Sequence, residues 1–250
     1  MGQASRHSGA GIPRIDWLGL DGLLVRFGDA LSEPANRAAL ALRHAILRED
    51  WPGVEEVTGA LVSTYLRFDA LHVDADALRA RLEDLVASRD WSGEPLPGGR
   101  RIWRVPAVFG GDLSPQLAEA AALAGVSPEQ AVSEIAGKRL RVQTIGFAPG
   151  QPYLGELPAH WDIPRQTELT PRAEVGALVV AIRQLTLFST AAPTGWRQVA
   201  RTALRPFQPD RAEPFVLRPG DEVVFEPVDR EVFERLQGDP QGGAVAEVLP

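Results

Sequence analysis

The N-terminal third of the chain alternates short apolar runs with amphipathic segments. Residues 22–27 (GLLVRF) alternate as a half-buried strand does, and Ser32 precedes a segment with apolar residues three and four positions apart, which predicts a helix. Residues 54–58 and 61–68 are rich in β-branched and aromatic residues and predict two further strands. A helix capped by Asp74 follows. The order strand, helix, strand, strand, helix favours a small open α+β sandwich.

A polar stretch rich in proline and glycine, residues 88–100 (SRDWSGEPLPGGR), separates this unit from a second one. The second unit opens with an apolar run at residues 101–109. Two helix starts follow: Ser114 begins a helix that ends at Gly125, and Ser127 forms a capping box with the glutamine three residues later.

The remainder of the second unit consists of short strand-like runs between proline and glycine turns, a spacing typical of a β-barrel or sandwich. The predicted strands cover residues 140–147, 176–182, 186–189, 196–200, 215–217 and 222–227. The expected organisation is therefore a flexible tail (1–18), an α+β domain (19–90), a β-barrel domain (100–230) and a Gly-rich C-terminal tail (231–250).

Composition narrows the class of protein. With 44% hydrophobic residues in 250, the chain has enough apolar side chains for proper cores, and no run is long enough to span a bilayer. The N-terminus lacks the charged start and apolar core of a secretion signal, so a cytoplasmic protein with no membrane partner is expected. A net charge of −7 argues against nucleic-acid binding, which depends on clustered cations.

The sequence contains no cysteine, which excludes disulfides, thiolate metal sites and a cysteine nucleophile. No HExxH, Walker, GxGxxG or GxSxG motif is present, so the sequence predicts no metal site and leaves catalytic residues unassigned. The single lysine, Lys138, has charged neighbours typical of a solvated side chain rather than of a Schiff base.

The stretch GFAPGQPYLGELP, residues 146–158, is the first candidate for chemistry. Its Pro149–Gly150 pair suits a type II turn, in which the third residue needs a positive φ. Gln151 and Tyr153 could then bind a small polar ligand. The alternative is a rigid packed connection, because ordinary turns use the same residues.

Two further stretches carry polar side chains beside apolar strands. Residues 193–202 (PTGWRQVART) combine a turn with a strand in which Trp196 is followed by Arg201, whose planar guanidinium can hold a carboxylate or phosphate. Gln184, at the end of an apolar run, could orient a ligand. The alternatives are a solvated arginine beside a core tryptophan, and a glutamine that only satisfies the end of a strand.

Taken together, these segments resemble the family that contains allophanate hydrolase subunit 1, the B-type subunit of 5-oxoprolinase and the KipI kinase inhibitors, the carboxyltransferase domain with subdomains C and D. The resemblance covers about residues 20–228. Its motifs are VP at 105–106, FGG at 109–111, GFAPG at 146–150, PYLG at 152–155, PR at 164–165 and 171–172, Gln184, PTGW at 193–196, RT at 201–202 and LRPGD at 217–221.

The resemblance implies an α+β protein: an N-terminal ferredoxin-like domain followed by a cyclophilin-like β-barrel. It also implies a subunit of an ATP-dependent amidohydrolase complex, of the 5-oxoprolinase or allophanate hydrolase kind, that acts only with a partner subunit. The expected partners are a homologous barrel subunit, which is either of the allophanate hydrolase subunit 2 type or the C-type subunit of 5-oxoprolinase, and a LamB/YcsF-type subunit. A KipI-type inhibitor of a sensor histidine kinase is the alternative. The substrate-binding residues expected from these patterns are Gln151, Tyr153, Gln184, Trp196 and Arg201.

The sequence departs from the family pattern at several of these positions. Gln151 stands where an aromatic residue is usual, and Ile135 stands where a histidine is usual. A common GGQTG becomes IRQLT at residues 182–186, while Thr194 and Ala200 replace glycines. A lost glycine restricts the backbone and a lost imidazole removes a titratable group, so a different ligand or activity is expected to be possible.

Overall fold

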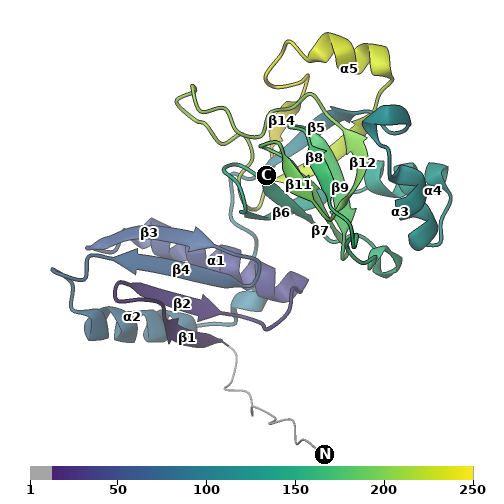
Figure 1. Ribbon diagram of the computed structural model, residues 1–250. Coiled ribbons are helices and arrows are strands. Elements are labelled where there is room, and N and C mark those ends of the chain that lie inside the picture. The colour runs from purple at the N-terminus through teal and green to yellow at the C-terminus, as the bar shows by residue number, and fades with distance from the viewer. Residues whose placement is uncertain (1–12, 250) are drawn as a thin grey trace, which may run out of the picture. The chain divides into compact units, whose positions relative to one another are not determined.

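The computed structural model describes residues 13–249, which divide into two compact units, Met1–Pro97 and Gly98–Pro250 (Figure 1). Residues 1–12 of the expected N-terminal tail lie outside the described part. The rest of that tail differs from the prediction, because Arg14–Trp17 forms strand β1, which pairs with the next strand along the chain.

In the first unit two helices cover one face of a four-stranded antiparallel sheet, with strand order β1-β2-β4-β3 (Figure 1). Its further elements are β2 (Gly22–Arg26), α1 (Glu33–Glu49), β3 (Val54–Gly59), β4 (Ser63–Phe68) and α2 (Ala75–Ala87). Both predicted caps form: Ser32 Oγ accepts from the Ala35 N–H at 3.4 Å, and Asp74 Oδ1 accepts from the Ala77 N–H at 3.0 Å. Alternate strand residues pack with the apolar stripes of both helices in one core.

The second unit is built on an eight-stranded sheet with the order β12-β9-β10-β7-β6-β13-β5-β14. β13 runs parallel to β5, and the other neighbours are antiparallel. β8 and β11 form a separate two-stranded sheet. The elements are β5 (Arg101–Ala107), α3 (Leu117–Leu123), α4 (Pro128–Ala136), β6 (Leu140–Ile145), β7 (Pro152–Gly155), β8 (Thr170–Ala173), β9 (Ala177–Ala181), β10 (Gln184–Leu187), β11 (Ala192–Thr194), β12 (Arg197–Arg201), β13 (Glu222–Pro227), α5 (Arg230–Leu236) and β14 (Val245–Val248).

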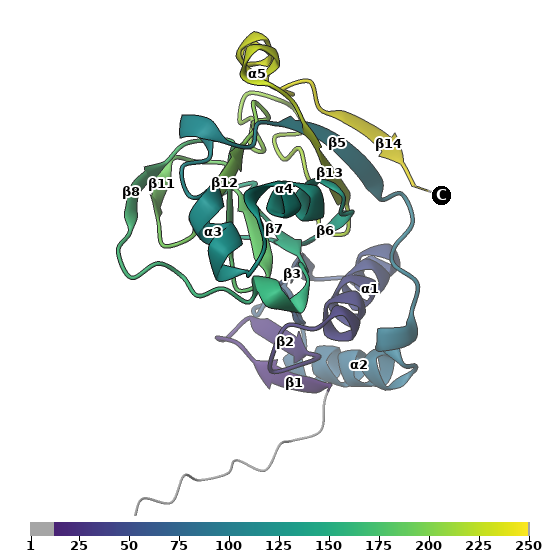
Figure 2. The same ribbon diagram turned by 90° about the vertical axis from the view of Figure 1, so that its right-hand side faces the viewer.

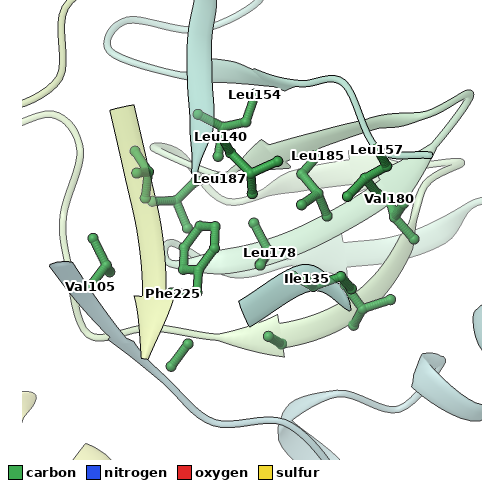
Figure 3. Packing of buried hydrophobic residues seen from close by; sticks show 14 of the residues in the cluster. Val105, Ile135, Leu140, Leu154, Leu157, Leu178, Val180, Leu185, Leu187 and Phe225 are labelled. Carbon is green, nitrogen blue, oxygen red and sulfur yellow. The ribbon is translucent and has the colours of Figure 1, made fainter. Parts of the chain in front are cut away.

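The main core of this unit lies between one face of the sheet and helices α3 and α4 (Figure 2). Figure 3 shows Ile135 of α4 together with Leu157 and Val180 in this core. Ile135 is fully buried there. An imidazole at this position would therefore need a hydrogen-bond partner inside a hydrocarbon core.

Three expectations for the second unit are corrected. The C-terminal region is not a tail, since α5 is followed by β14, whose backbone pairs with β5. The helix predicted from Ser114 begins at Leu117, because Ser114 Oγ accepts from the Gly110 N–H. Residues 215–217 contribute only one bridge, between Phe207 and Phe215.

The predicted mixture of helices and sheets is confirmed, but the expected β-barrel is not present as a closed ladder of strands. Two backbone hydrogen bonds between Val108 and Arg201, of 2.8 and 3.0 Å, join β12 to the chain just after β5. Within residues 13–249, no helix is long and apolar enough to cross a membrane.

Candidate functional site

A cavity of about 260 Å³ lies on the face of the eight-stranded sheet that points away from α3 and α4. Tyr153, Thr186 and Phe188 alternate along their strands with leucines of the main core, so they project to the opposite face. We call this site the aromatic cavity. Its lining residues are Phe147, Gln151, Tyr153, Arg165, Gln166, Leu169, Thr186, Phe188, Pro193, Thr194, Gly195 and Trp196.

The predicted turn before β7 positions the first of these side chains. Gly150 has φ +70°, and the Gln151 N–H donates to the Ala148 carbonyl at 3.1 Å, as in a type II turn with Pro149 and Gly150 at its centre. A Cβ on Gly150 would lie 2.9 Å from the Cβ of Phe207, so this position requires glycine. The second half of the GFAPGQPYLGELP stretch is strand β7, not a loop, and it places Tyr153 between β6 and β10.

Two aromatic rings form one wall of the cavity. Tyr153 and Trp196 are packed edge to face with their ring centres 6.0 Å apart. The guanidinium carbon of Arg165 lies 5.5 Å from the centre of the Trp196 ring, within the range of a cation–π contact.

Hydrogen bonds fix the position of Trp196. Its N–H donates to Thr194 Oγ1 at 3.0 Å, and its carbonyl accepts from Gln166 Nε2 at 3.1 Å. Gln166 Oε1 in turn accepts from Gln116 Nε2 at 2.6 Å. The backbone at Trp196 is therefore held on both sides, which gives the indole ring a defined place in the wall.

The opposite side of the cavity contains buried polar atoms without a hydrogen-bond partner. Gln151 and Thr186 are each only 2% exposed, and neither Gln151 Oε1 nor Thr186 Oγ1 has a partner. A buried, unsatisfied polar group costs about 1–3 kcal/mol. Two such groups in one cavity indicate that a polar ligand completes their hydrogen bonding.

The cavity lining carries one cation and no other side chain that is charged at neutral pH. No aspartate, glutamate, histidine or lysine lines it, and among the described residues no carboxylate lies within ion-pair distance of Arg165. Burial raises the pKa of the Tyr153 hydroxyl, an effect partly offset by the Arg165 charge and by a hydrogen bond from the Gln151 side chain. Tyr153 is thus a neutral phenol, and the cavity can bind and orient a ligand but supplies no general base.

Gln151, Tyr153 and Trp196 are brought together in this cavity, but the structure places Gln184 elsewhere. The Gln184 side chain is buried, and its Nε2 donates to Gln143 Oε1 at 2.8 Å. Its position matches the alternative of a glutamine that satisfies a neighbouring strand.

Arg201 also lies outside the cavity lining. Its backbone is the bridge partner of Val108, and its side chain is half-buried with no partner for Nε. Burial lowers the pKa of its guanidinium, partly opposed by the charge of Glu174. Arg165, which sequence reasoning left among solvated arginines, is the cation of the cavity. The sequence signal for it was its place directly after Pro164, in a motif of the resemblance.

The departures from the family pattern fall in different environments. Ile135 packs in the main core and does not border the aromatic cavity, so the absence of an imidazole there does not alter the cavity. Ile182 and Arg183 form the two-residue turn between β9 and β10, with φ values of 45° and 63°. Both residues occupy the left-handed region that glycine adopts without strain, which explains the usual glycines.

A larger cavity of about 830 Å³ lies within the first unit, between α2 and the start of α1. Its floor is apolar, and charged side chains at its rim are already paired: Arg79 with Glu83 at 2.8 Å, and Arg14 with Asp16 at 2.8 Å. No polar atom lining it is buried without a partner. The aromatic cavity is therefore the better candidate site. The described residues contain no cluster of histidine and acidic side chains that could hold a metal ion.

Comparison with known proteins shows the same relationship as the sequence motifs. The family model of the carboxyltransferase domain, subdomain C and D, matches residues 13–217. The B-type subunit of 5-oxoprolinase from Bacillus subtilis (strain 168) is 28% identical over 222 residues, 85% of this chain and 91% of that protein. The corresponding 5-oxoprolinase subunit of Escherichia coli O157:H7 is 38% identical over 134 residues, 54% of this chain and 62% of that protein.

Among solved structures, the crystal structure of TTHA0988 superposes with a TM-score of 0.70 at 32% sequence identity. The match covers 84% of this chain and 40% of that chain. This chain therefore corresponds to less than half of that longer polypeptide.

Proposed function

Because the chain belongs to the family of the carboxyltransferase domain, subdomains C and D, we propose that it is the B-type subunit of a 5-oxoprolinase-like complex. The proposal rests on the match to the B-type 5-oxoprolinase subunit over 91% of the Bacillus subtilis protein. In this proposal the first unit is the ferredoxin-like domain, and the second is the cyclophilin-like domain.

The aromatic cavity is the proposed substrate site of this subunit. The observation that carries this assignment is the pair of buried, unpartnered oxygens of Gln151 and Thr186 that face the same cavity as Arg165. A volume of 260 Å³ holds about nine water-sized groups at roughly 30 Å³ each. A compact cyclic amide such as 5-oxoproline has about that number of non-hydrogen atoms.

ATP does not fit this cavity. A nucleoside triphosphate is several times larger than the available volume, and one arginine is too few cations to hold its phosphates. In the proposed complex, ATP binds elsewhere and supplies the activation that an amide carbonyl needs before its C–N bond can be hydrolysed. This chain holds and orients the amide.

The lining has no general base, which supports the need for partner subunits that bring the reacting groups. We take these to be a homologous C-type subunit of 5-oxoprolinase and a LamB/YcsF-type subunit. The KipI-type alternative has no observation in its favour, since the matched curated relatives are all B-type subunits of 5-oxoprolinase.

The test is reconstitution. The chain is co-purified with the two proposed partners, and ADP release is measured with and without 5-oxo-L-proline. We expect substrate-dependent ADP release from the complete complex and none when this chain is omitted. Equal release without this chain, or no release from the complete complex, would reject the function.

A further inference from the structure

We propose that Arg165 and Gln151 recognise opposite ends of the ligand in the aromatic cavity: Arg165 binds an anionic group, and Gln151 Oε1 accepts a hydrogen bond from an N–H or O–H group. This inference rests on the proposed function and extends it to the residues that select the substrate. The ligand class is a small monoanion that carries a hydrogen-bond donor at the end away from its charge.

Arg165 meets the requirements of an anion-binding residue. Its side chain is exposed at the cavity, and no carboxylate among the described residues neutralises it. The Trp196 ring lies beneath the guanidinium, and Trp196 itself is held by Gln166 and Thr194. The planar group is therefore positioned by stacking, while its N–H groups remain available for two oxygens of a carboxylate.

Gln151 defines the other end of the site. Its side chain is almost completely buried, and an amide oxygen can only accept a hydrogen bond. A ligand that presents a donor to this oxygen removes the cost of an unsatisfied acceptor, whereas an apolar ligand leaves that cost in place. Thr186 Oγ1, also buried and unpartnered, can donate or accept beside it.

The remaining lining residues limit the ligand further. Tyr153, Phe188 and Trp196 provide apolar ring surfaces between the two polar ends, which suits a compact ligand with a hydrocarbon middle. The lining offers no second cation, so a dianion would leave one charge without a partner. A carboxylated amide with a free N–H meets all of these conditions.

The experiment measures the binding of three ligands to the purified chain by isothermal titration calorimetry. 5-Oxo-L-proline has the anion and the N–H, cyclopentanecarboxylate has only the anion, and 2-pyrrolidinone has only the N–H. The variants are Arg165→Gln and Gln151→Met, and Arg201→Gln is the matched control because that arginine lies outside the cavity lining.

We expect Arg165→Gln to weaken both carboxylates about 10-fold or more and to leave 2-pyrrolidinone unchanged, because a charge-assisted contact is lost. Gln151→Met should weaken 5-oxo-L-proline and 2-pyrrolidinone roughly 2- to 10-fold, with cyclopentanecarboxylate unaffected. Arg201→Gln should leave all three ligands unchanged.

Three results would overturn the inference: no loss of carboxylate binding in Arg165→Gln, an equal loss in Arg201→Gln, or no binding of any of the three ligands to the wild-type chain. The proposed function is judged separately, by ADP release from the reconstituted complex. A complex that is active with 5-oxo-L-proline and equally active with Arg165→Gln would sink this inference while leaving the function intact.

Discussion

The side chains of Gln184 and Gln143 form a buried pair, with Gln184 Nε2 2.8 Å from Gln143 Oε1. The pair links β10 to β6 across the intervening strand β7. A glutamine that appears on the sequence as a possible ligand contact is thus part of the hydrogen bonding of the sheet itself.

Replacing Gln184 with Met should therefore reduce stability. The change removes a buried donor and leaves an acceptor of Gln143 without it, at a cost of about 1–3 kcal/mol. Chemical denaturation measures the effect, and Gln151→Met is the matched control, since that amide oxygen has no partner to lose. Equal stability of Gln184→Met and wild type would contradict the structural assignment of Gln184.

The turn between β9 and β10 predicts a stabilising substitution. Ile182 is a β-branched residue with φ 45°, a left-handed conformation that costs an L-residue roughly 1–2 kcal/mol. Asparagine is favoured in such two-residue hairpin turns. We expect Ile182→Asn to raise the free energy of unfolding by about 1 kcal/mol, because Ile182 is partly exposed and loses little packing.

Thermal unfolding provides the measurement for this turn. Arg183→Asn is the comparison: Arg183 has the same kind of backbone conformation, but its side chain binds the Leu157 carbonyl at 3.1 Å and Glu156 at 3.1 Å. That variant should gain less. A lower melting temperature for Ile182→Asn than for wild type would show that strain at this position is not the dominant effect.

The contacts of Glu134 predict a pH-dependent stability. Its carboxylate accepts from Trp161 Nε1 at 2.6 Å and contacts His160 Nε2 at 2.7 Å, and these interactions lower the pKa of Glu134, the tryptophan bond most strongly. A carboxyl group with a lowered folded-state pKa contributes stability that is present above its ordinary pKa of 4.5 and is lost as the pH falls through the folded-state value.

Glu134→Gln keeps an acceptor for Trp161 but removes the charge. At pH 7 we expect this variant to melt a few degrees below the wild type at most, because the carboxylate is partly exposed. The two melting curves should converge as the pH falls below the ordinary value of 4.5. A difference that stays constant down to strongly acidic pH would exclude the titration of Glu134 as its cause.

Arg197 is predicted to hold the segment that carries Arg165. It is 6% exposed, and its guanidinium donates to the Pro164 carbonyl at 2.6 Å and to Glu119 at 2.8 Å. Arg197→Met should cost about 1–3 kcal/mol, because the Pro164 carbonyl loses its donor. Glu119→Gln should cost less than about 1 kcal/mol, because Glu119 is half exposed. Similar losses in the two variants, measured by urea unfolding, would contradict this division of roles.

The sequence alone determined the elements that local patterns encode. The caps at Ser32, Asp74 and Ser127 form as predicted, and so does the Pro149–Gly150 turn, because each depends on residues within a few positions of one another. The motifs from residue 105 to residue 221 likewise identified the family. The strands β1 and β14 were missed, since edge strands that bury little apolar surface carry a weak alternating pattern.

Only the tertiary structure decided which polar side chains share a site. Gln151, Tyr153 and Trp196 meet because β7, β10 and the start of β12 turn the same face toward β8 and β11, whereas Gln184 finds Gln143 on a neighbouring strand. Arg165 and Arg201 cannot be told apart by local pattern, yet only Arg165 reaches the Trp196 ring. Strand pairing over long sequence separations sets these meetings, and a local pattern contains no record of them.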